Sequence, residues 1–368
     1  MVSPSSSPSD PFAFLVGRGA VAELTTSGAW VATLAEVEAA VAAAQAEAGD
    51  IPAAAAAVVA TLAASIDDDD VATIVDRAAL GGNLVIPLVD LLRERAGTQA
   101  PHVHRGATSQ DIADTAAMLV AKRCLGATAA SLDEALLAVT ELEQFAGTPV
   151  IARTLLQWAE PTTFGATLAR WRDGLATARA AAATAAADLP LQLGGPVGDG
   201  ASFGEHYGTI AAGVARRLDL HRPDRAWHSQ RSPIVALAGT LATVSTAAAT
   251  VATDIVHLAA SDAGEVVEHA KGAGQSSSMA HKRNPVAAVC ARAAAAQAPG
   301  LVATLLAAAG SHELERAAGP WHAEWPALNQ LLRCTGSAVD WIATSLQRVV
   351  PDTGRMAANL ADSNVARR

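Results

Sequence analysis

The stretch 272-GAGQSSSMAHKRNPVAAV-289 sets a short polar string between glycines and an alanine-rich run. Proline suits the first turn of a helix, so Pro285 predicts a helix start with Asn284 as its N-cap. The positive end of that helix would then face the string, beside Lys282 and Arg283. The stretch therefore predicts a polar loop that closes on an anion at the start of a helix.

The three serines of this string suggest chemistry. A hydroxyl is a useful base only where cations and N–H donors stabilise its alkoxide. Lys282, Arg283 and the expected helix start would supply both. A flexible surface loop in front of a capped helix is the alternative that the string alone leaves open.

The composition predicts helices around the loop. Hydrophobic residues make up 51% of the chain but aromatic residues only 4%, and alanine supplies most of the apolar residues. Alanine has the highest helix propensity and buries little area, whereas strands favour β-branched and aromatic residues. Apolar residues recur with helical spacing, and the alternation typical of strands is almost absent. We therefore expect an all-α fold of long helices that pack closely in a bundle.

Breaks in the helical spacing place the expected elements. The acidic run Asp67–Asp70 suits the N-terminus of a helix. Long helices are expected from Ser232 to about His269, and from Pro285 to about Pro299 or beyond. Polar loops are expected near residues 99–111, 147–165 and 271–285. Scaffolds of helices usually present their chemistry at such loops.

Charge and cysteine content exclude several kinds of protein. The net charge is −10 and no basic cluster occurs, so no nucleic-acid partner is expected. Cys124, Cys290 and Cys334 have no metal-like spacing and form no disulfide framework. His102 and His104 are the nearest metal candidate, and we expect no metal there. The N-terminus lacks the features of a signal peptide, and no uninterrupted apolar run reaches the ~18 residues of a membrane span. We expect a cytoplasmic protein without a membrane partner.

A second polar string, 104-HRGATSQDIADTA-116, opens another expected helix. Thr108 and Asp111 have the spacing of a capping box. The N–H groups of this helix start, with the hydroxyls of Thr108 and Ser109, would also form a seat for a carboxylate. A cap without further function is the alternative, and His104 taken alone is more often a structural residue.

Three strings together carry a family resemblance. SSSMAHKRNP resembles the signature loop of the fumarase/aspartase superfamily, GATSQDIADTA resembles its first conserved segment, and ARTLLQWAEPTTFG resembles its second. Their order and spacing also match. The resemblance implies an all-α fold with a long central helix bundle, a small N-terminal helical domain and a shortened C-terminal one. It also implies a homotetramer in which each active site takes the three segments from three chains, without a cofactor.

Four further features resemble the 3-carboxy-cis,cis-muconate cycloisomerase family within that superfamily. They are HKRNP after the Met of the loop, 81-GGNLVIPLV-89, 192-QLGGPVGDGASFG-204 and 315-ERAAGPWHAEW-325. The implied activity converts 3-carboxy-cis,cis-muconate, a tricarboxylate, and 4-carboxymuconolactone in protocatechuate degradation, the β-ketoadipate pathway. A fumarate-releasing lyase similar to adenylosuccinate lyase, and a non-catalytic structural homologue, remain alternatives.

The resemblance assigns roles to residues of the three segments. Ser276 matches the proposed general base, and Lys282 matches a residue that stabilises the enolate-like intermediate. The residues expected to bind substrate are His104, Thr108, Ser109, Arg153, Thr154, Gln157, Ser277, Arg283 and Asn284. Arg316 and His322 would reach the site from a neighbouring subunit, whereas Trp321 and Trp325, four residues apart on a helix, are more often packing residues.

The departures from the superfamily pattern carry information. Leu155 stands where many of these lyases have a histidine that protonates the leaving group. Opening of a lactone expels a carboxylate, which needs no proton, so Leu155 argues against lyases that expel an amine. Gln275 and Ala280 replace an expected Gly and Pro of the loop. The expected division of the chain is a tail (1–17), an N-terminal helical domain (18–98), the central bundle (99–348) and a remnant of a C-terminal domain (349–368).

Overall fold

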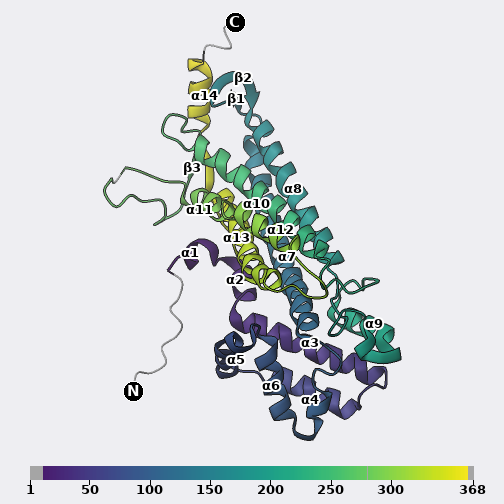
Figure 1. Ribbon diagram of the computed structural model, residues 1–368. Helices are drawn as coiled ribbons and strands as arrows, with labels where there is room; N and C mark the ends of the chain where they lie inside the picture. The colour runs from purple at the N-terminus through teal and green to yellow at the C-terminus, as the bar shows by residue number, and fades with distance from the viewer. Residues whose placement is uncertain (1–10, 280, 364–368) are drawn as a thin grey trace, which may run out of the picture.

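Long helices make up most of the computed structural model, which describes residues 11–279 and 281–363 (Figure 1). The predicted all-α class with a long helix bundle is confirmed. The expected tail falls largely outside the described residues, and so does Ala280 of the signature loop.

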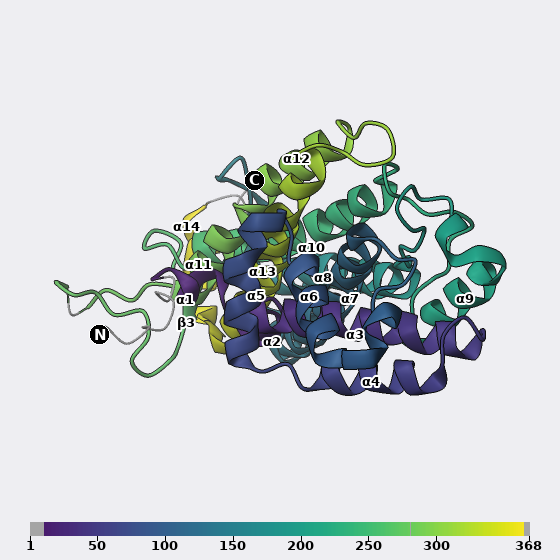
Figure 2. The same ribbon diagram turned by 60° about the horizontal axis from the view of Figure 1, so that its bottom comes forward.

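The first helices of the chain form a group at one end of the molecule. They are α1 (Ala13–Val16), α2 (Gly19–Leu24), α3 (Ser27–Glu47), α4 (Ala53–Ala64), α5 (Asp68–Gly81), α6 (Val85–Ala96) and the 3-10 helix η1 (Gly97–His102). Figure 2 shows α3, α4, α5 and α6 side by side in front of the bundle. The acidic run caps α5 as predicted, because Asp67 and Asp70 form a capping box. Arg95 pairs with Asp70 at 2.6 Å and fixes α6 against it.

The bundle consists of the longer helices that follow. They are α7 (Ser109–Leu142), α8 (Phe164–Asp188), α10 (Ser232–Leu258), α11 (Val286–Ala295), α12 (Ala298–Ala309) and α13 (Pro320–Arg348). Alanine allows close approach, and the few large side chains fill the gaps between helices. Trp171 of α8 is buried, and its indole N–H donates to Asp254 of α10 at 2.9 Å. The alanine-rich composition thus explains why the helices of the bundle pack closely.

Short elements join the long helices. They are η2 (Glu143–Phe145), η3 (Ala201–His206), α9 (Tyr207–Leu218), α14 (Thr353–Asp362) and the strands β1 (Pro149–Thr154), β2 (Gln157–Thr163), β3 (Val266–Glu268) and β4 (Val349–Pro351). β1 and β2 form an antiparallel hairpin, in which Val150 pairs with Thr162. β3 pairs with β4 in antiparallel register, so the chain after α13 is tied to the chain after α10. The hairpin contacts α14 at the other end of the bundle from the N-terminal helices (Figure 1).

Three expectations about these elements were wrong. Residues 147–165 are a β-hairpin rather than a loop, because the buried Val150 and Ile151 pack its first strand onto the bundle. The helix from Ser232 ends at Leu258, well before residue 269, since the backbone turns at Gly264 and continues as β3. The N-cap of α11 is Pro285 and not Asn284.

Two described helical stretches, Ser232–Leu258 and Val286–Ala309, are long and apolar enough to cross a membrane by length and composition. Thr and Ser residues interrupt the apolar run of the first one. α10 packs against α8, α11, α12 and α13, as core helices of a helical bundle do. The expected lack of a membrane partner therefore stays a prediction.

The length of α7 separates two of the segments singled out in the sequence. With 34 residues, this helix is roughly 50 Å long. Thr108 precedes its first residue, and the hairpin with Arg153 follows its last turn. The first and second segments of one chain therefore lie at opposite ends of the bundle.

Candidate functional site

The start of α7 forms the first candidate region. Thr108 is the N-cap, and the Asp111 carboxylate accepts the Thr108 N–H at 3.1 Å, which confirms the predicted capping box. The same carboxylate accepts the N–H groups of Gly194 at 2.7 Å and Gly195 at 2.9 Å. Asp111 thereby fixes the glycine-rich loop 192–204 against the helix start.

The start of α7 offers backbone N–H groups to a ligand. Within the described part of the chain, the N–H groups of Ser109 and Gln110 donate to no acceptor. Arg316 donates to Thr108 Oγ1 at 2.6 Å and to Gln110 Oε1 at 3.2 Å. Free N–H groups, two hydroxyls and a guanidinium at the positive end of a long helix form a binding site for an anion. Arg316 thus reaches the first segment of its own chain.

A network of buried charged side chains joins the start of α7 to the neighbouring elements. The Arg231 guanidinium lies between Asp114 at 2.6 Å and Glu324 at 2.5 Å, and all three side chains are at most 3% exposed. Burial works against the charge of Arg231, but Asp114 and Glu324 outweigh it and raise its pKa. Trp321 is buried, donates to Asp114 at 2.9 Å and packs edge-on against Trp325, so the predicted packing role is confirmed.

His104 lies beside the first segment, in a partnership of its own. Its Nδ1 is 2.6 Å from the Glu38 carboxylate of α3, and the two side chains are 13% and 1% exposed. Burial alone would lower the pKa of His104, but the charge of Glu38 and its hydrogen bond raise it. The structure therefore gives His104 a link between α3 and the first segment. Its expected contact with substrate stays a prediction.

The second candidate region is the tip of the hairpin. Thr154 pairs with Gln157 across the turn, and Arg153 pairs with Trp158. The turn residues, Leu155 and Leu156, have positive φ angles of 51° and 63°, a conformation that favours glycine or asparagine. Leu155 is 96% exposed.

The charge of Arg153 already has a partner on the bundle. Its guanidinium binds Glu265 at 2.8 and 3.0 Å, and Glu265 is 2% exposed. The hairpin is therefore fixed close to its turn, whereas the two leucines of the turn itself face outward.

The third candidate region is the signature loop, residues 271–285. Ser276 Oγ accepts the N–H groups of Met279 at 3.2 Å and Ser278 at 3.4 Å. Two N–H donors on one hydroxyl oxygen favour its negatively charged form. Asn284 bonds back to Gly274 through its backbone N–H at 2.9 Å, and so narrows the base of the loop.

The start of α11 is closed to an outside anion. Pro285 has no N–H, and the Val286 N–H bonds Asn284 O at 2.9 Å. The next two N–H groups, of Ala287 and Ala288, donate to the Glu268 carboxylate at 3.0 and 2.8 Å. The sequence-based expectation that this helix start faces a substrate anion was therefore wrong, because a carboxylate of the chain itself occupies it.

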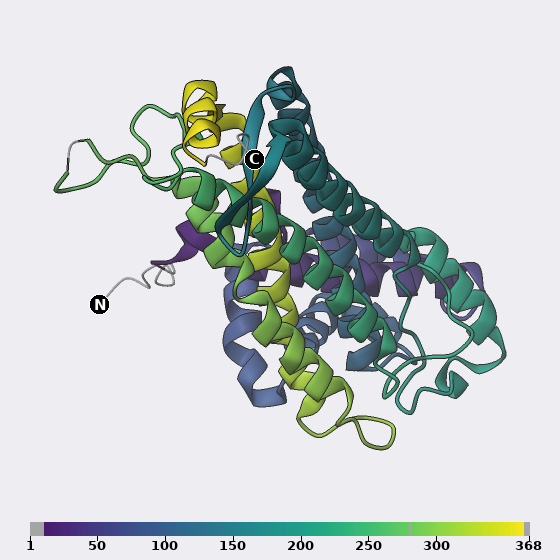
Figure 3. The ribbon, with the colours of Figure 1, turned by 90° about the horizontal axis from the view of Figure 1, so that it is seen from above.

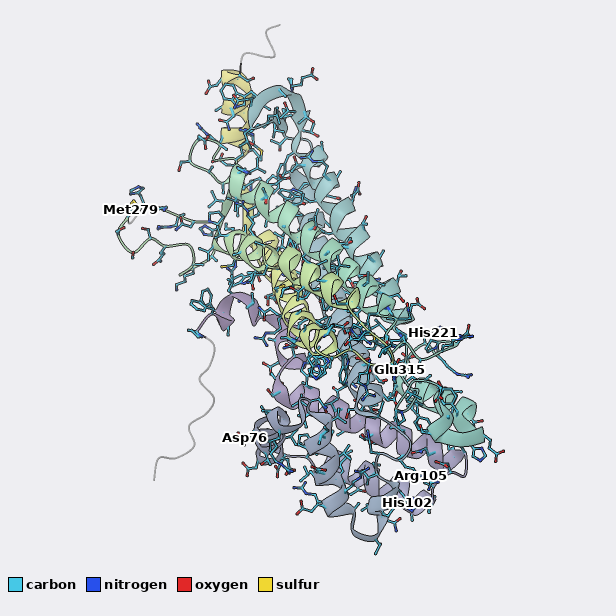
Figure 4. The ribbon with its side chains drawn as sticks, viewed as in Figure 1. Asp76, His102, Arg105, His221, Met279 and Glu315 are labelled. Carbon is cyan, nitrogen blue, oxygen red and sulfur yellow. The ribbon has the colours of Figure 1, made fainter. Side chains whose placement is uncertain are left out.

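The three regions do not meet within one chain. Met279 marks the signature loop, which projects from one side of the bundle, whereas Arg105 and Glu315 lie at the other end (Figure 4). Seen from above, the loop extends to the left, away from the bundle, and the hairpin does not follow it (Figure 3). The structure groups Thr108 and Ser109 with Arg316; Arg153, Thr154 and Gln157 on the hairpin; and Ser276, Ser277, Lys282, Arg283 and Asn284 on the loop.

Sequence reasoning missed the positions of two residues of this arrangement. Glu268 received no role, and Arg316 was expected at a neighbouring subunit. Both contacts join residues distant in the chain, and neither follows a local pattern. The motif 315-ERAAGPWHAEW-325 marks Arg316, but no local pattern places it beside Thr108 of its own chain.

Comparisons with known proteins show the family of the chain. The model of a family described as lyase matches residues 18–300. A 3-carboxy-cis,cis-muconate cycloisomerase of Bradyrhizobium diazoefficiens is 38% identical, over 88% of this chain and 73% of its own length. A nitrosuccinate lyase of Streptomyces davaonensis is 37% identical, over 91% of this chain and 73% of its own.

A solved structure gives the same result for the fold. The 3-carboxy-cis,cis-muconate lactonizing enzyme from Pseudomonas putida superimposes with a TM-score of 0.87 at 32% identity, covering 95% of this chain and 79% of that one. Matches of this extent in both sequence and fold, together with the three segments in their order, decide the family. The chain belongs to the lyase family of the fumarase/aspartase superfamily, which includes the 3-carboxy-cis,cis-muconate cycloisomerases.

Proposed function

We propose that the protein is a cycloisomerase that interconverts 3-carboxy-cis,cis-muconate and 4-carboxymuconolactone in protocatechuate degradation. The observation that carries this proposal is the Ser276 hydroxyl, whose oxygen accepts two backbone N–H groups on a loop that also bears Lys282. The names of the cycloisomerase relatives support the choice of substrate.

The start of α7 would bind one carboxylate of the tricarboxylate substrate. Its N–H groups of Ser109 and Gln110, the Thr108 hydroxyl and the Arg316 guanidinium offer both charge and hydrogen bonds. The global charge of −10 repels a tricarboxylate, so this local positive site is what the substrate needs. Binding there would orient the diene toward the loop of a neighbouring chain.

The chemical step forms one C–O bond and transfers one proton to carbon. A carboxylate oxygen of the substrate adds to a double-bond carbon and closes the five-membered lactone. The π electrons of that double bond move to the carbon beside another carboxylate. This carbon and its carboxylate together become an aci-carboxylate. Ser276 then gives its proton to this carbon, and water restores the proton of the serine. The N–H groups of Ser278 and Met279, with Lys282, would stabilise the transient alkoxide and the intermediate.

Leu155 at the hairpin tip fits this chemistry. In the reverse direction the lactone oxygen leaves as a carboxylate, a stable anion that needs no acid. A lyase that expels an amine needs a proton donor at that place. The exposed leucine argues against amine-expelling chemistry of the adenylosuccinate lyase kind.

Elimination from nitrosuccinate is a second candidate function. One relative bears that substrate in its name, at 37% identity. Nitrite is also a stable leaving anion, so Leu155 cannot distinguish the two activities. Nitrosuccinate has two carboxylates and the muconate three, so the number of cations in the assembled site would decide between them.

The test offers each substrate to the purified protein. Loss of the diene absorbance of 3-carboxymuconate, with the lactone identified by NMR, is the expected result. Release of nitrite from nitrosuccinate without turnover of the muconate would replace the proposal by the second candidate. Thermal stabilisation by tricarboxylates without any turnover would instead identify a non-catalytic homologue.

We also propose a homotetramer with active sites shared between subunits. The separation of the three regions in one chain supports it, because the resemblance assigns all three to one site. A groove of about 790 Å³ between α10 and the pair α11 and α12 is lined mainly by Ala and Thr, and would accept helices of another copy. The expected mass is four times 37.2 kDa, which sedimentation equilibrium measures.

The proposed step uses only groups of the protein and needs no cofactor.

A cytoplasmic location belongs to the same proposal. Cys124 and Cys334 are buried free thiols whose pKa values are raised by burial, to about 12 and about 11. Inert reduced thiols suit a reducing compartment. Fractionation of cells that express the protein tests the location.

A further inference from the structure

One carboxylate joins three parts of the chain at the base of the signature loop. Glu268 is the last residue of β3, directly before the loop, and its side chain accepts the N–H groups of Ala287 at 3.0 Å and Ala288 at 2.8 Å, directly after it. Glu268 Oε1 also accepts the hydroxyl of Ser345 in α13 at 2.6 Å. Ser345 is fully buried. Both ends of the loop are thereby fastened to the core of the bundle.

The Glu268 carboxylate also satisfies backbone N–H groups in the first turn of α11. Pro285 has none and the Val286 N–H bonds Asn284 O, so Glu268 takes the donors that remain there. A carboxylate is favoured at the positive end of a helix, and its hydrogen bonds to N–H groups are charge-assisted. Glu268 thus stabilises the start of α11 as a substrate anion would.

The loop between its two ends has few such ties. Ser276 is half-buried and Lys282 is exposed, and the hydrogen bonds of Ser276 Oγ and of the Lys282 N–H are made within the loop. The His269 N–H bonds Arg348 O at 2.8 Å, and the two arms of the loop are joined by the Asn284 N–H bond to Gly274 O at 2.9 Å and by the bridge between Gln275 and Arg283. The position of Ser276 therefore depends on how firmly the two ends are held.

Glu265, three residues earlier, holds the hairpin in a similar way. It binds Arg153, and it accepts the side-chain amide of Asn359 in α14 at 2.7 Å. One short segment thus carries two carboxylates, one that binds the hairpin next to its turn and one that binds the ends of the loop. Glu265 therefore contacts the hairpin, and Glu268 contacts the ends of the loop.

We propose that Glu268 is a positioning residue for the catalytic loop. Its carboxylate holds the two loop ends together, so that Ser276 and Lys282 return to the same place in each turnover. The role of these two residues rests on the proposed function, whereas the hold on the loop does not. The start of α7, at the far end of the bundle, should be unaffected by a change at Glu268.

The kinetic test replaces Glu268 by Gln. The amide has one acceptor oxygen where the carboxylate has two, and its NH₂ group faces an N–H donor. We expect kcat to fall about tenfold or more while KM changes about twofold or less, since substrate still binds at α7. Glu268→Asp keeps the charge and should restore part of kcat. Glu134→Gln on the exposed face of α7 is the matched control.

The structural test uses trypsin on the native protein without substrate. Lys271, Lys282 and Arg283 are cleavage sites within the loop, and mass spectrometry reports their cleavage. Glu268→Gln should be nicked there several times faster than wild type, with an unchanged circular dichroism spectrum and assembly mass. Because this test needs no substrate, it decides the proposal even if the proposed function fails.

Two outcomes would overturn the proposal. Wild-type nicking together with wild-type kcat in Glu268→Gln would show that the carboxylate does not hold the loop. A variant that unfolds, with no recovery in Glu268→Asp and with cleavage spread over the whole chain, would show a general structural role instead.

Discussion

Arg316 donates a hydrogen bond to Thr108 Oγ1 at 2.6 Å, although the two residues lie 208 positions apart in the chain. The contact places a guanidinium beside the two free N–H groups at the start of α7. The start of α11, in contrast, is filled by Glu268. Of the two helix starts that the sequence marks as anion sites, only the first is open.

Replacing Arg316 by Lys should weaken substrate binding. Lysine keeps the charge but cannot bond Thr108, Gln110 and the Pro196 carbonyl together, as the guanidinium does. We expect KM to rise about tenfold with a smaller change in kcat, because the fork geometry of arginine is lost. Steady-state kinetics measure it. Arg172→Lys, at an exposed ion pair with Glu143, should change neither constant. Equal KM values for both variants would contradict the anion site.

Ser276→Ala should remove most of the activity. The hydroxyl that receives the Met279 and Ser278 N–H groups is lost, and we expect kcat to fall on the order of 10²-fold, as for other general acid–base residues. Ser277→Ala serves as the comparison and should lose much less. A large loss in Ser277→Ala with an active Ser276→Ala would transfer the role to the neighbouring serine. The thermal midpoints of both variants should stay at the wild-type value, since the loop is exposed.

The parts of the fold that sequence predicts correctly depend on local signals. Alanine content and helical spacing indicate the bundle, and the capping boxes of α5 and α7 need only residues three positions apart. The hairpin was missed because the run TLLQWAEPTT does not alternate, and a proline at 161 pairs with Ile151 inside it. The first strand packs through the buried Val150 and Ile151, whereas the second strand is largely exposed and is held by its pairing with the first.

The site shows the same limit more strongly. The loop residues Ser276 and Lys282 stand in one string and could be assigned from it. The Glu268 bond to Ala287 and the Arg316 bond to Thr108 depend on chain paths between distant elements. A Pro after polar residues suggests an open helix start, and no local pattern reveals that a carboxylate 19 positions away occupies it.

Two inactive variants should restore activity when they share one oligomer. Ser276→Ala damages the loop, and Arg316→Gln damages the first segment, and these lie in different regions of the chain. If each site combines regions of different subunits, random mixing leaves about a quarter of the sites intact. Co-expression with two affinity tags and an activity assay of the doubly purified protein measures this. The matched control pairs Ser276→Ala with Lys282→Ala, which share the loop and should stay inactive. No recovery in the first pair would mean that sites are not shared.

Arg231→Met should destabilise the protein strongly. The change leaves the carboxylates of Asp114 and Glu324 buried and close to each other without their cation. Loss of one partner of a buried ion pair typically costs about 3–5 kcal/mol. The urea midpoint, followed by circular dichroism, should fall accordingly. Arg179→Met, at a surface ion pair with Asp133, should leave the midpoint nearly unchanged. A wild-type midpoint in Arg231→Met would mean that apolar packing replaces the network without loss.

The pair of His104 and Glu38 should make stability depend on pH. The charge of Glu38 raises the pKa of His104 in the folded protein above its unfolded value of roughly 6.5. The folded state then binds a proton more tightly than the unfolded state does. The pair's contribution is therefore fully present below the unfolded pKa and is lost as pH rises through the folded pKa.

A His104→Asn variant isolates this contribution. The difference in thermal midpoint between wild type and variant should be largest near pH 5.5 and should shrink steadily as the pH rises past the raised pKa. His221→Asn, at an exposed histidine, gives the baseline for the loss of an imidazole. A difference that stays constant over this range, or that grows toward high pH, would mean that the imidazole is held neutral against Glu38. The contact at 2.6 Å would then join α3 to the first segment through an ordinary hydrogen bond rather than an ion pair.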